Sequence, residues 1–587
     1  MMRRRSVLTA CLIAPVAGAV SGATASAAAA DPGPPTVTPA DLTFRNDVLR
    51  TGTARSVGLL PEQVASMPGI AASYLAPTPD HPTWPAYAGA SVLAAHNGVI
   101  VSRFAVGDAV RYSAVGPAPA REGVELPPEQ RIPARPDTIW DLASISKLFT
   151  TVTLLQQVEA GRVSLDAPVA QYVPDFAKPE ITVRHLLTHS AGLPAFLPFY
   201  SSYPTPETRL RAAITTPVTA GTRPGGQYVY SDIGLIVLGV LVERVTGKGL
   251  ARAVQDSVIG PLGMKDTGYN PAASLKPRIA ATEYEPYVNR GMVWGEVHDE
   301  NAWSLGGVAG HAGLFSTVDD MAIFCQMLLN GGTYAGRRVL AESTVRAALV
   351  NYNAALEQTY PESDRGLGFE LNKHWYMGGL SSPVTFGHTG FTGTTIVIDP
   401  LAHSFLILFS NRVHPDRNWG SNNVARRALA KAFSNAHPVR PPSGQAWRAG
   451  ANDQQTATLT APLKSPGRAG AVLSAQLWYD TEPRTDVVRV QTSADGVTWT
   501  LLPLHLRAPG AGNFDSDGTL TGFGGRVWWQ VIATLPAGVR HVRFSYTTDV
   551  SSQGRGVYVD RVLVDDHGAT LFRGDGLRAD GWTLTNS

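Results

Sequence analysis

The sequence predicts an α+β fold in which helices flank an antiparallel sheet with an inserted helical subdomain, followed by an all-β sandwich. Three observations predict it. Strand-like alternation of apolar residues occurs near residues 88–106 and again within residues 367–411. Helical periodicity fills the chain between these regions, and beyond residue 455 only short alternating strands remain. Strands at both ends with helices between them fit one sheet built from both ends of a domain.

Local signals define the elements of the first domain. Asn97-Gly98 favours a type I′ turn, which predicts a hairpin over residues 88–106. A helix is expected from about residue 144 to residue 160, where Gly161 ends it. Further helices are expected at residues 183–187, 233–246, 251–259, 318–329, 342–350 and 424–436, and strands at 367–371, 385–388, 394–398 and 405–411.

The chain length requires more than one core, because 587 residues exceed what a single ordinary domain buries. We expect a linker where prolines and glycines gather before the all-β region. The predicted division is a signal peptide at 1–30, an N-terminal extension at 31–86, a first folded domain at 87–436, a linker at 437–455 and an accessory β-sandwich at 456–587.

The first 30 residues carry the pattern of an export signal. Arg3 to Arg5 form a positive start, an apolar and small-residue stretch follows, and Ala-x-Ala sites end at Ala30. Residues 4–8 resemble a twin-arginine signal. We therefore expect a secreted or cell-envelope protein with no transmembrane span after cleavage of the signal.

Composition narrows the classes of partner. The net charge of +2 and the absence of a dense basic cluster argue against nucleic acid. Cys11 leaves with the signal, so Cys325, in an apolar helix-like run, has no partner for an intramolecular disulfide. No metal-ligand pattern stands out among the 14 histidines, so we expect no metal in the domain at 87–436 and no cofactor.

The tetrad from Ser144 to Lys147 is the first candidate for chemistry. Residues three apart share a helix face, so Lys147 reaches the Ser144 hydroxyl. A serine needs a base to become nucleophilic, and a neutral lysine serves. By itself the tetrad is weak, because the same spacing also fits a capped helix with an exposed lysine.

Two further motifs add to it. Tyr230 and Asp232 stand just before an apolar helix, and a tyrosine there shares a proton network with Lys147, whose charge favours the phenolate. His388, Thr389 and Gly390 end a strand-like run and place a cationic or hydrogen-bonding edge opposite Ser144. The alternatives are a buried aromatic beside a helix cap and a strand end with a glycine turn.

These motifs, in this order, resemble the serine β-lactamases and penicillin-binding proteins. The tyrosine-type second motif and the His-Thr-Gly motif resemble the class C β-lactamase, DD-peptidase and esterase branch. The likeness spans roughly residues 55–436. The phrases that strengthen it are DLASISKLFT at 141–150, HLLTHSAGLP at 185–194, PLGMKDT at 261–267 and GHAGLFST at 310–317.

The resemblance implies a serine hydrolase that works through an acyl-enzyme on Ser144. Lys147 and Tyr230 are implied as proton carriers, and His388 as the replacement for the usual lysine. The backbone N–H groups of Ser144 and Phe391 are implied as the oxyanion hole. Substrate-binding and oxyanion positions are therefore expected at Asp232, His388, Thr389, Gly390 and Phe391.

Two departures from the family pattern bear on the substrate. Asp232 stands where many β-lactamases carry asparagine, and a carboxylate only accepts hydrogen bonds. His388 is neutral for much of the time near pH 7, unlike lysine. Both weaken recognition of an anionic β-lactam, so a D-Ala-type cell-wall peptide or a small acyl ester is the favoured substrate. His189 and His311 are interpreted as structural.

The second domain resembles accessory sandwich modules of secreted bacterial hydrolases, on residues 490–499, 556–562 and 570–575. Its tryptophans at 478, 499, 528 and 529 are either a sugar-stacking platform or sandwich core, and Asp560, Asp565 and Asp566 are candidate Ca²⁺ ligands. The alternative function is accordingly a penicillin-type sensor or polysaccharide-binding protein with little turnover.

Overall fold

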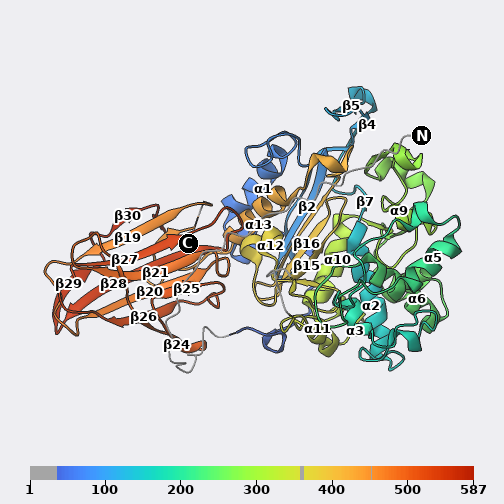
Figure 1. Cartoon of the computed structure of the whole chain (residues 1–587). Coiled ribbons are helices and arrows are strands. Elements are labelled where there is room, and N and C mark those ends of the chain that lie inside the picture. Colours follow the sequence, from blue (N-terminus) through green and yellow to red (C-terminus); the bar gives the residue numbers. More distant parts are fainter. Residues whose placement is uncertain (1–35, 357–362, 451) are drawn as a thin grey trace, which may run out of the picture.

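The computed structural model describes residues 36–356, 363–450 and 452–587 and consists of a mixed α/β body joined to a β-sandwich (Figure 1). The expected signal peptide at 1–30 lies outside the described residues. Within them no helix is long and apolar enough to cross a membrane.

The central sheet confirms the predicted α+β class. Strand β17 from late in the chain pairs antiparallel with the early strand β2, so the sheet is built from both ends of the domain. All pairs are antiparallel except β1 with β3. In sheet order the main strands are β1 Arg50–Thr51, β3 Val99–Val110, β2 Gly89–His96, β17 Ser404–Ser410, β16 Thr395–Asp399, β15 Phe386–Thr389 and β14 Glu370–Leu371.

The hairpin between β2 and β3 turns where the sequence predicts it. Asn97 and Gly98 have φ angles of 51° and 72°. Both lie in the left-handed region that a type I′ turn requires, and asparagine and glycine adopt it at low cost.

Alternate residues of the sheet bury two different cores. On β17, Phe405, Ile407 and Phe409 face the core beneath the helical subdomain. Leu406 and Leu408 face helices α1 (Pro61–Ser73) and α13 (Asn423–Asn435). This period of two is the pleat of a strand that is covered on both sides.

Helices cover both faces of this sheet. Helices α1 Pro61–Ser73 and α13 Asn423–Asn435 pack on one face (Figure 1). The other face carries α2 Ser146–Glu159, α10 Val318–Leu329 and the inserted helices. These are α3 Val183–Leu187, α4 Phe199–Ser202, α5 Pro206–Thr215, α6 Asp232–Thr246, α7 Leu250–Val254, α8 Gly260–Leu262, α9 Glu300–Ser304 and α11 Glu342–Ala348. The short helix α12 His374–Met377 packs with α13 on the first face.

The C-terminal part is a sandwich of two antiparallel sheets around its own apolar core. Strand β18 lies within the residues expected as a linker, yet it pairs with β28 and β31 of the sandwich. One sheet contains β24 Gly512–Ser516, β23 Leu504–Ala508, β26 Trp529–Thr534, β20 Val472–Asp480, β28 Gly556–Asp566, β18 Ala446–Ala449 and β31 Thr583–Thr585. The other contains β22 Thr500–Leu501, β21 Val487–Ser493, β27 His541–Thr547, β19 Thr456–Pro462 and β30 Arg578–Asp580.

The sugar-platform hypothesis for the sandwich is not supported. Trp529 is fully buried in the sandwich core, and Trp478 packs edge-on against Tyr558. Trp528 donates from its indole to the Arg440 carbonyl at 2.9 Å. Three of the four tryptophans therefore serve packing, as their large apolar area favours.

The three candidate Ca²⁺ ligands already have protein partners. The Asp560 carboxylate accepts from the Ser443 hydroxyl, Asp565 accepts from the Gly568 backbone N–H, and Asp566 pairs with Arg468. The structure assigns these carboxylates to a loop cap, a turn and an ion pair.

The sandwich and the α/β body share a buried ionic contact. Arg526 of the sandwich pairs with Asp399 at the end of β16 at 2.6 Å and also donates to the carbonyls of Leu380 and Ser381. Asp480 lies 3.5 Å from the same guanidinium. This contact fixes the sandwich against the end of the central sheet.

Candidate active site

Ser144 sits on a strained turn that precedes helix α2. The turn is a 3₁₀ segment, Ala143–Ile145, and α2 begins at Ser146, two residues later than the sequence predicts. Ala143 has a φ of 45°, which is unusual for a residue with a Cβ atom. The Asp141 carboxylate holds this turn, because it accepts from the backbone N–H of Ala143 at 2.8 Å and from that of His298 at 2.7 Å.

Lys147 is buried, with 1% of its surface exposed, and its ammonium meets three acceptors. Its Nζ lies 2.8 Å from Ser144 Oγ, 3.1 Å from the His311 carbonyl oxygen and 2.8 Å from an Asp232 oxygen. Burial disfavours the charged form, but the Asp232 carboxylate and Tyr230 outweigh it, so the pKa of Lys147 is raised. The resting site therefore holds an ammonium, whereas the sequence favours a neutral lysine.

Tyr230 completes the wall beside Lys147. The Lys147 Nζ lies 5.0 Å from the centre of the Tyr230 ring, and the His189 imidazole stacks on the same ring at 4.5 Å. Burial raises the pKa of Tyr230 more than Lys147 and Arg365 lower it. The expectation of a phenolate is therefore wrong for the resting site, because the sequence does not show how far the ring is desolvated.

His189 and His311 have structural roles, as the sequence predicts. The His189 Nδ1 accepts from the Ser231 backbone N–H at 3.0 Å, which fixes the ring that stacks on Tyr230. The His311 Nε2 lies 2.8 Å from Asp299, and its carbonyl binds Lys147. Both histidines position catalytic candidates through their own hydrogen bonds.

His388 ends β15 as a buried, neutral imidazole. Its Nδ1 lies 2.8 Å from the Thr389 carbonyl oxygen, which only accepts, so Nδ1 carries the hydrogen. Its Nε2 lies 3.5 Å from the Arg365 guanidinium. Burial and the nearby Arg365 and Lys147, opposed by Glu370, lower the pKa of His388 to about 4. The positive edge expected here is therefore absent from His388 itself.

Arg365 supplies a charge beside this site that sequence reasoning missed. Its guanidinium, 1% exposed, donates to the Tyr228 hydroxyl at 3.0 Å and pairs with Glu370 at 2.9 Å. It also lies 5.3 Å from the centre of the Tyr230 ring. No spacing pattern links residues 228, 365 and 370, so only the tertiary fold brings them together.

The turn between β15 and β16 is tied to the Ser144 turn. Thr392 and Thr394 donate their hydroxyls to the carbonyls of Asp141 and Leu142, at 2.7 and 3.0 Å. A Cβ atom at Gly390 would lie 2.5 Å from the Leu142 carbonyl oxygen, so only glycine fits there. Phe391, 46% exposed, is thereby held in the wall of the cavity above Ser144.

The cavity above Ser144 measures about 490 Å³ and carries positive charge. Arg412 donates to the Phe391 and Gly420 carbonyls, and Arg426 donates to those of Gly390 and Thr394. Among the described residues neither arginine forms an ion pair with a carboxylate. The lining residues are Ser144, Tyr228, Tyr230, Arg365, Glu370, Lys373, Trp375, Thr389, Gly390, Phe391, Arg412, Ser421, Asn422, Asn423 and Arg426.

The pKa values of these two arginines reflect the missing counter-charge. Burial lowers the pKa of Arg412 to about 10 and that of Arg426 to about 9. Desolvated cations without a carboxylate are costly, and an anionic ligand would relieve that cost.

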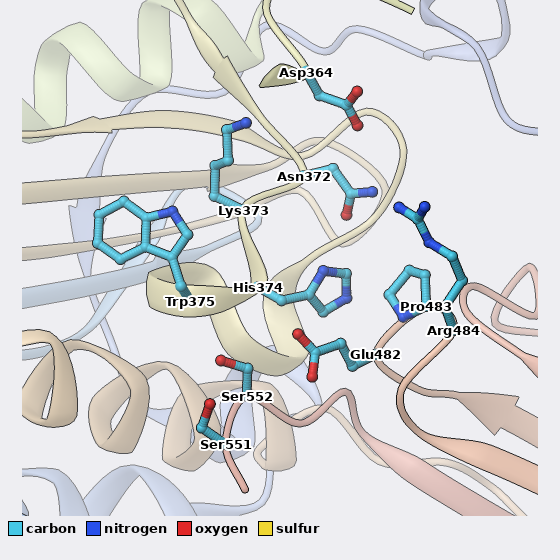
Figure 2. Close-up of a pocket in the computed structure, with 10 residues that line it drawn as sticks. All are labelled: Asp364, Asn372, Lys373, His374, Trp375, Glu482, Pro483, Arg484, Ser551 and Ser552. Carbon is cyan, nitrogen blue, oxygen red and sulfur yellow. The ribbon is translucent and has the colours of Figure 1, made fainter. Parts of the chain in front are cut away.

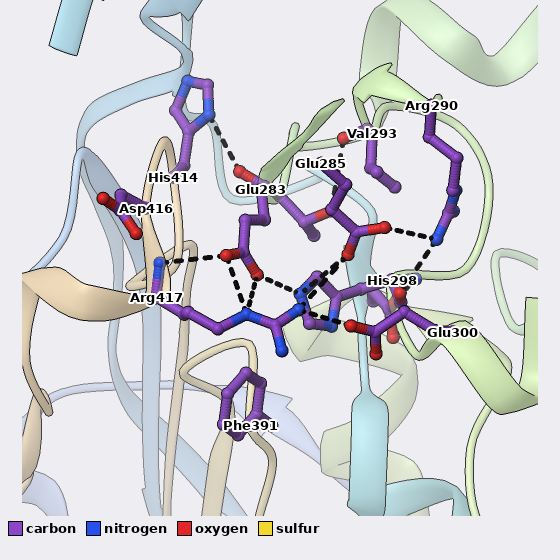
Figure 3. A network of polar contacts seen from close by, with 12 residues as sticks. Glu283, Glu285, Arg290, Val293, His298, Glu300, Phe391, His414, Asp416 and Arg417 are labelled. Carbon is purple, nitrogen blue, oxygen red and sulfur yellow. Dashed lines mark hydrogen bonds and ion pairs between the residues drawn. The ribbon is translucent and has the colours of Figure 1, made fainter. Parts of the chain in front are cut away.

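A buried ionic network supports the other side of Phe391 (Figure 3). Glu283, Glu285 and His298 have oxygen and nitrogen atoms close enough to share a metal ion. The guanidinium of Arg417 occupies that position instead, at 2.7 Å from Glu283, while His298 lies 2.8 Å from the same carboxylate. The His298 ring stacks on Phe391 at 5.5 Å.

The remaining charges of that network are also paired. Arg290 binds Glu285 at 2.9 Å, and Glu300 binds Arg417 at 2.8 Å. Because cationic side chains already fill the cluster, we interpret it as a scaffold for Phe391 and for the His298 backbone that binds Asp141.

Fold and site together define a serine hydrolase of the β-lactamase type. Residues 83–431 match the Beta-lactamase family, and the chain belongs to that family. A protein of Escherichia coli named "Putative D-alanyl-D-alanine carboxypeptidase" is 36% identical over 324 residues, which cover 49% of this chain and 72% of that protein. A protein of the same name from Salmonella agona is 35% identical over 320 residues, 48% of this chain and 71% of that protein.

Solved structures similar to this chain have lower sequence identity. A penicillin-binding protein homolog from Caulobacter crescentus is 21% identical with a TM-score of 0.48, over 65% of this chain and 99% of that one. The hydrolase EstCE1 is 20% identical with a TM-score of 0.49, over 64% and 99%. The family match ends at residue 431, so the sandwich lies outside it.

Proposed function

We propose that this chain is an exported DD-carboxypeptidase-type hydrolase that releases a C-terminal residue from D-Ala-ended peptides through an acyl-enzyme on Ser144. The observation that carries the proposal is the pair of arginines that line the cavity above Ser144, Arg426 buried and Arg412 partly buried, neither of which pairs with a carboxylate among the described residues. A peptidase of this type must hold the free carboxylate of its substrate. The name of the E. coli relative supports the same substrate class.

In the proposed mechanism Ser144 Oγ attacks the scissile carbonyl, and the oxyanion is stabilised by the backbone N–H groups of Ser144 and Phe391. Lys147 first loses one proton from its ammonium, then accepts the Ser144 proton and passes it to the leaving amine. Asp232 sets the free energy of that first loss, because it holds the charged form of Lys147. Water then hydrolyses the ester and restores Ser144.

Acylation is tested by intact mass after reaction with a fluorophosphonate and with a fluorescent penicillin. The wild type should gain one adduct, and Ser144→Ala should gain none. Equal labelling of the two proteins would exclude Ser144 as the nucleophile. Persistent acylation of the wild type without turnover of any substrate would favour the alternative function of a sensor.

Carboxylate recognition is tested with a D-Ala-D-Ala peptide and its C-terminal amide. Charge-assisted hydrogen bonds contribute about 1.5–3 kcal/mol, so the free acid should have a kcat/KM about 10–100-fold higher. Arg412→Gln should bring the acid-to-amide ratio of kcat/KM close to one; because Arg412 also donates to the Phe391 carbonyl, the ratio and not the absolute rate is the readout. Equal rates on acid and amide, with faster turnover of the ester, would make the protein an esterase instead.

Export is the second half of the proposal. It is supported by the charged, apolar and Ala-x-Ala pattern of residues 1–30. The full chain should be expressed in a bacterium that has both the general secretory route and the twin-arginine route. The product should then lie outside the cytoplasm, with Asp31 as its N-terminus. A cytoplasmic product that keeps residue 1 or 2 would contradict this.

A further inference from the structure

The Phe391 side chain is an exposed aromatic ring in the wall of the cavity above Ser144. The residue is 46% exposed, although three side chains hold the ring in place. The guanidinium groups of Arg412 and Arg417 lie 4.4 and 5.4 Å from the ring centre, and the His298 ring stacks at 5.5 Å (Figure 3). A ring that is already fixed loses little conformational entropy when a ligand packs against it.

The backbone of Phe391 places this ring relative to the scissile bond. In the proposed mechanism its N–H group binds the oxyanion, which requires a distance of about 3 Å. The fit of Gly390 against the Leu142 carbonyl and the hydrogen bond from Arg412 Nε to the Phe391 carbonyl, at 2.9 Å, fix the backbone on both sides. The ring of the same residue therefore lies beside the groups that flank the scissile carbonyl.

Arg412 indicates which of the two flanking groups meets the ring. Its guanidinium is proposed to hold the terminal carboxylate of the substrate, and it contacts Phe391 directly. The carboxylate and the side chain of an amino acid are bonded to the same carbon atom. A terminal residue that is bound by Arg412 therefore carries its side chain within reach of the Phe391 ring.

A second cavity, at the boundary between the α/β body and the sandwich, gives room for the rest of the peptide (Figure 2). It measures about 410 Å³ and shares Lys373 and Trp375 with the cavity above Ser144. Of these two cavities, Phe391 and Arg412 line only the one above Ser144. The acyl part of a peptide can thus continue past Trp375, and the single leaving residue is left to the Phe391 side.

The methyl group of D-Ala would cover little of this aromatic wall. The free energy gained on binding grows with the apolar area that is removed from water, so a larger apolar side chain gains more from the same ring. The cavity, at about 490 Å³, has room for such a side chain. A cationic side chain is disfavoured, because the guanidinium groups of Arg412 and Arg417 lie against the ring.

We propose that the Phe391 side chain selects the leaving residue, so that peptides whose terminal D-residue has a branched or aromatic apolar side chain, such as D-leucine or D-phenylalanine, are preferred over those that end in D-Ala. This inference rests on the proposed function, because it narrows the substrate class of the same site. It gives the ionic network behind Phe391 a part in substrate selection.

The test uses the full chain and two peptides with the same acyl part, one ending in D-Ala-D-Ala and one in D-Ala-D-Leu. Both form the same acyl-enzyme, so their kcat/KM values compare acylation alone. The wild type should favour D-Ala-D-Leu about tenfold, and in Phe391→Ala the ratio should fall to about one. Leu584→Ala, which shortens an exposed apolar side chain on strand β31, should keep the wild-type ratio.

Binding gives a second readout that does not depend on the oxyanion donor. Calorimetry with Ser144→Ala should show the same tenfold preference in Kd, and adding Phe391→Ala should abolish it. This measurement covers the case in which Phe391→Ala alone is too slow to assay. A third peptide, ending in D-Leu-D-Ala, carries the large side chain on the acyl part. A preference for that peptide which Phe391→Ala removes would show that the ring faces the acyl part, and would overturn the assignment.

The two levels of the proposal fail differently. If the wild type hydrolyses both peptides with equal kcat/KM, or D-Ala-D-Ala faster, the selection by Phe391 is wrong and the peptidase function stands. A preference for D-Leu that persists in Phe391→Ala would also exclude Phe391. If neither peptide is hydrolysed while p-nitrophenyl acetate is, the peptidase function is wrong, and the selection falls with it.

Discussion

At the scale of single residues, the unusual feature of the site is the ion pair between Lys147 and Asp232. The carboxylate lies 2.8 Å from Nζ and raises the pKa of the lysine that has to act as the base. Activity should therefore rise with pH as Lys147 loses its proton. An opposite charge at this distance shifts a pKa by about 1–3 units.

Asp232→Asn should move the rising limb of the pH profile of acylation to lower pH by about 1–3 units, because the amide no longer stabilises the ammonium. Stopped-flow acylation by a fluorescent penicillin between pH 5 and pH 10 measures it as a faster rate of Asp232→Asn at each pH along the rising slope, since the wild-type midpoint lies above this range. A limb at the same pH in both proteins would show that Lys147 is not the group that titrates. Melting curves at each pH control for unfolding.

A second prediction at this scale concerns a histidine outside the reaction. His414 is buried, its Nε2 accepts from the backbone N–H groups of Arg111 and Tyr112, and burial lowers its pKa to about 3. The unfolded chain binds the proton near pH 6.5 and the folded chain does not, so the stability that His414 confers is lost as the pH falls below 6.5.

The difference in free energy of unfolding between wild type and His414→Gln should therefore narrow below pH 6.5, by up to about 1.4 kcal/mol per pH unit. Urea unfolding at pH 7, 6 and 5 measures it. A difference that is constant with pH, or that widens toward acid, would mean that His414 is protonated in the folded protein.

The identity of the site residues could be predicted where they form a sequence motif. Their protonation states could not, because these depend on burial. Ser144, Lys147, Tyr230 and His388 follow from spacing and order along the chain, and the fold brings them together. The protonation states of Lys147 and Tyr230 did not follow, because they depend on Asp232 and on desolvation. Arg412 and Arg426 belong to no recognisable motif. They lie beside Ser144 because they hydrogen-bond to carbonyls of the turn between β15 and β16.

At the scale of elements, the turn between β15 and β16 positions Gly390 and Phe391 beside Ser144. Two threonine hydroxyls bind it to the chain just before Ser144, and Arg426 binds its carbonyls. The sequence predicted strand β15 within a residue at each end. It did not predict this docking, since the hydrogen bonds join residues about 250 positions apart.

Gly390→Ala should displace this turn, because the added Cβ would meet the Leu142 carbonyl oxygen at 2.5 Å and the Thr394 hydroxyl at 2.0 Å. Loss of one oxyanion donor costs about 10²–10³-fold in kcat, and we expect a loss of that size. Gly69→Ala in helix α1, where a Cβ meets nothing within 4 Å, is the matched control. A kcat within twofold of the wild-type value would contradict the assignment of the Phe391 backbone N–H to the oxyanion hole.

At the scale of the whole molecule, the sequence predicted the class and order of the folded parts but not how they meet. Composition and periodicity distinguish an α/β body from an all-β region. The contact between them depends on single side chains such as Arg526, whose partners Asp399, Leu380 and Ser381 lie more than 120 positions earlier in the chain. The cavity at the domain boundary is lined by residues of both domains, so no local sequence pattern predicts it.

Arg526→Ala tests whether the boundary acts as one structural unit. The change leaves the Asp399 and Asp480 carboxylates buried without their cation, and breaking a buried pair in this way costs about 3–5 kcal/mol. We expect a lower urea midpoint and faster proteolysis between residues 437 and 445. Arg507→Ala, an exposed arginine paired with Gln530, should change neither. Adding Asp399→Asn to Arg526→Ala should recover part of the loss, whereas an unchanged midpoint in Arg526→Ala would show that the two domains unfold independently of this contact.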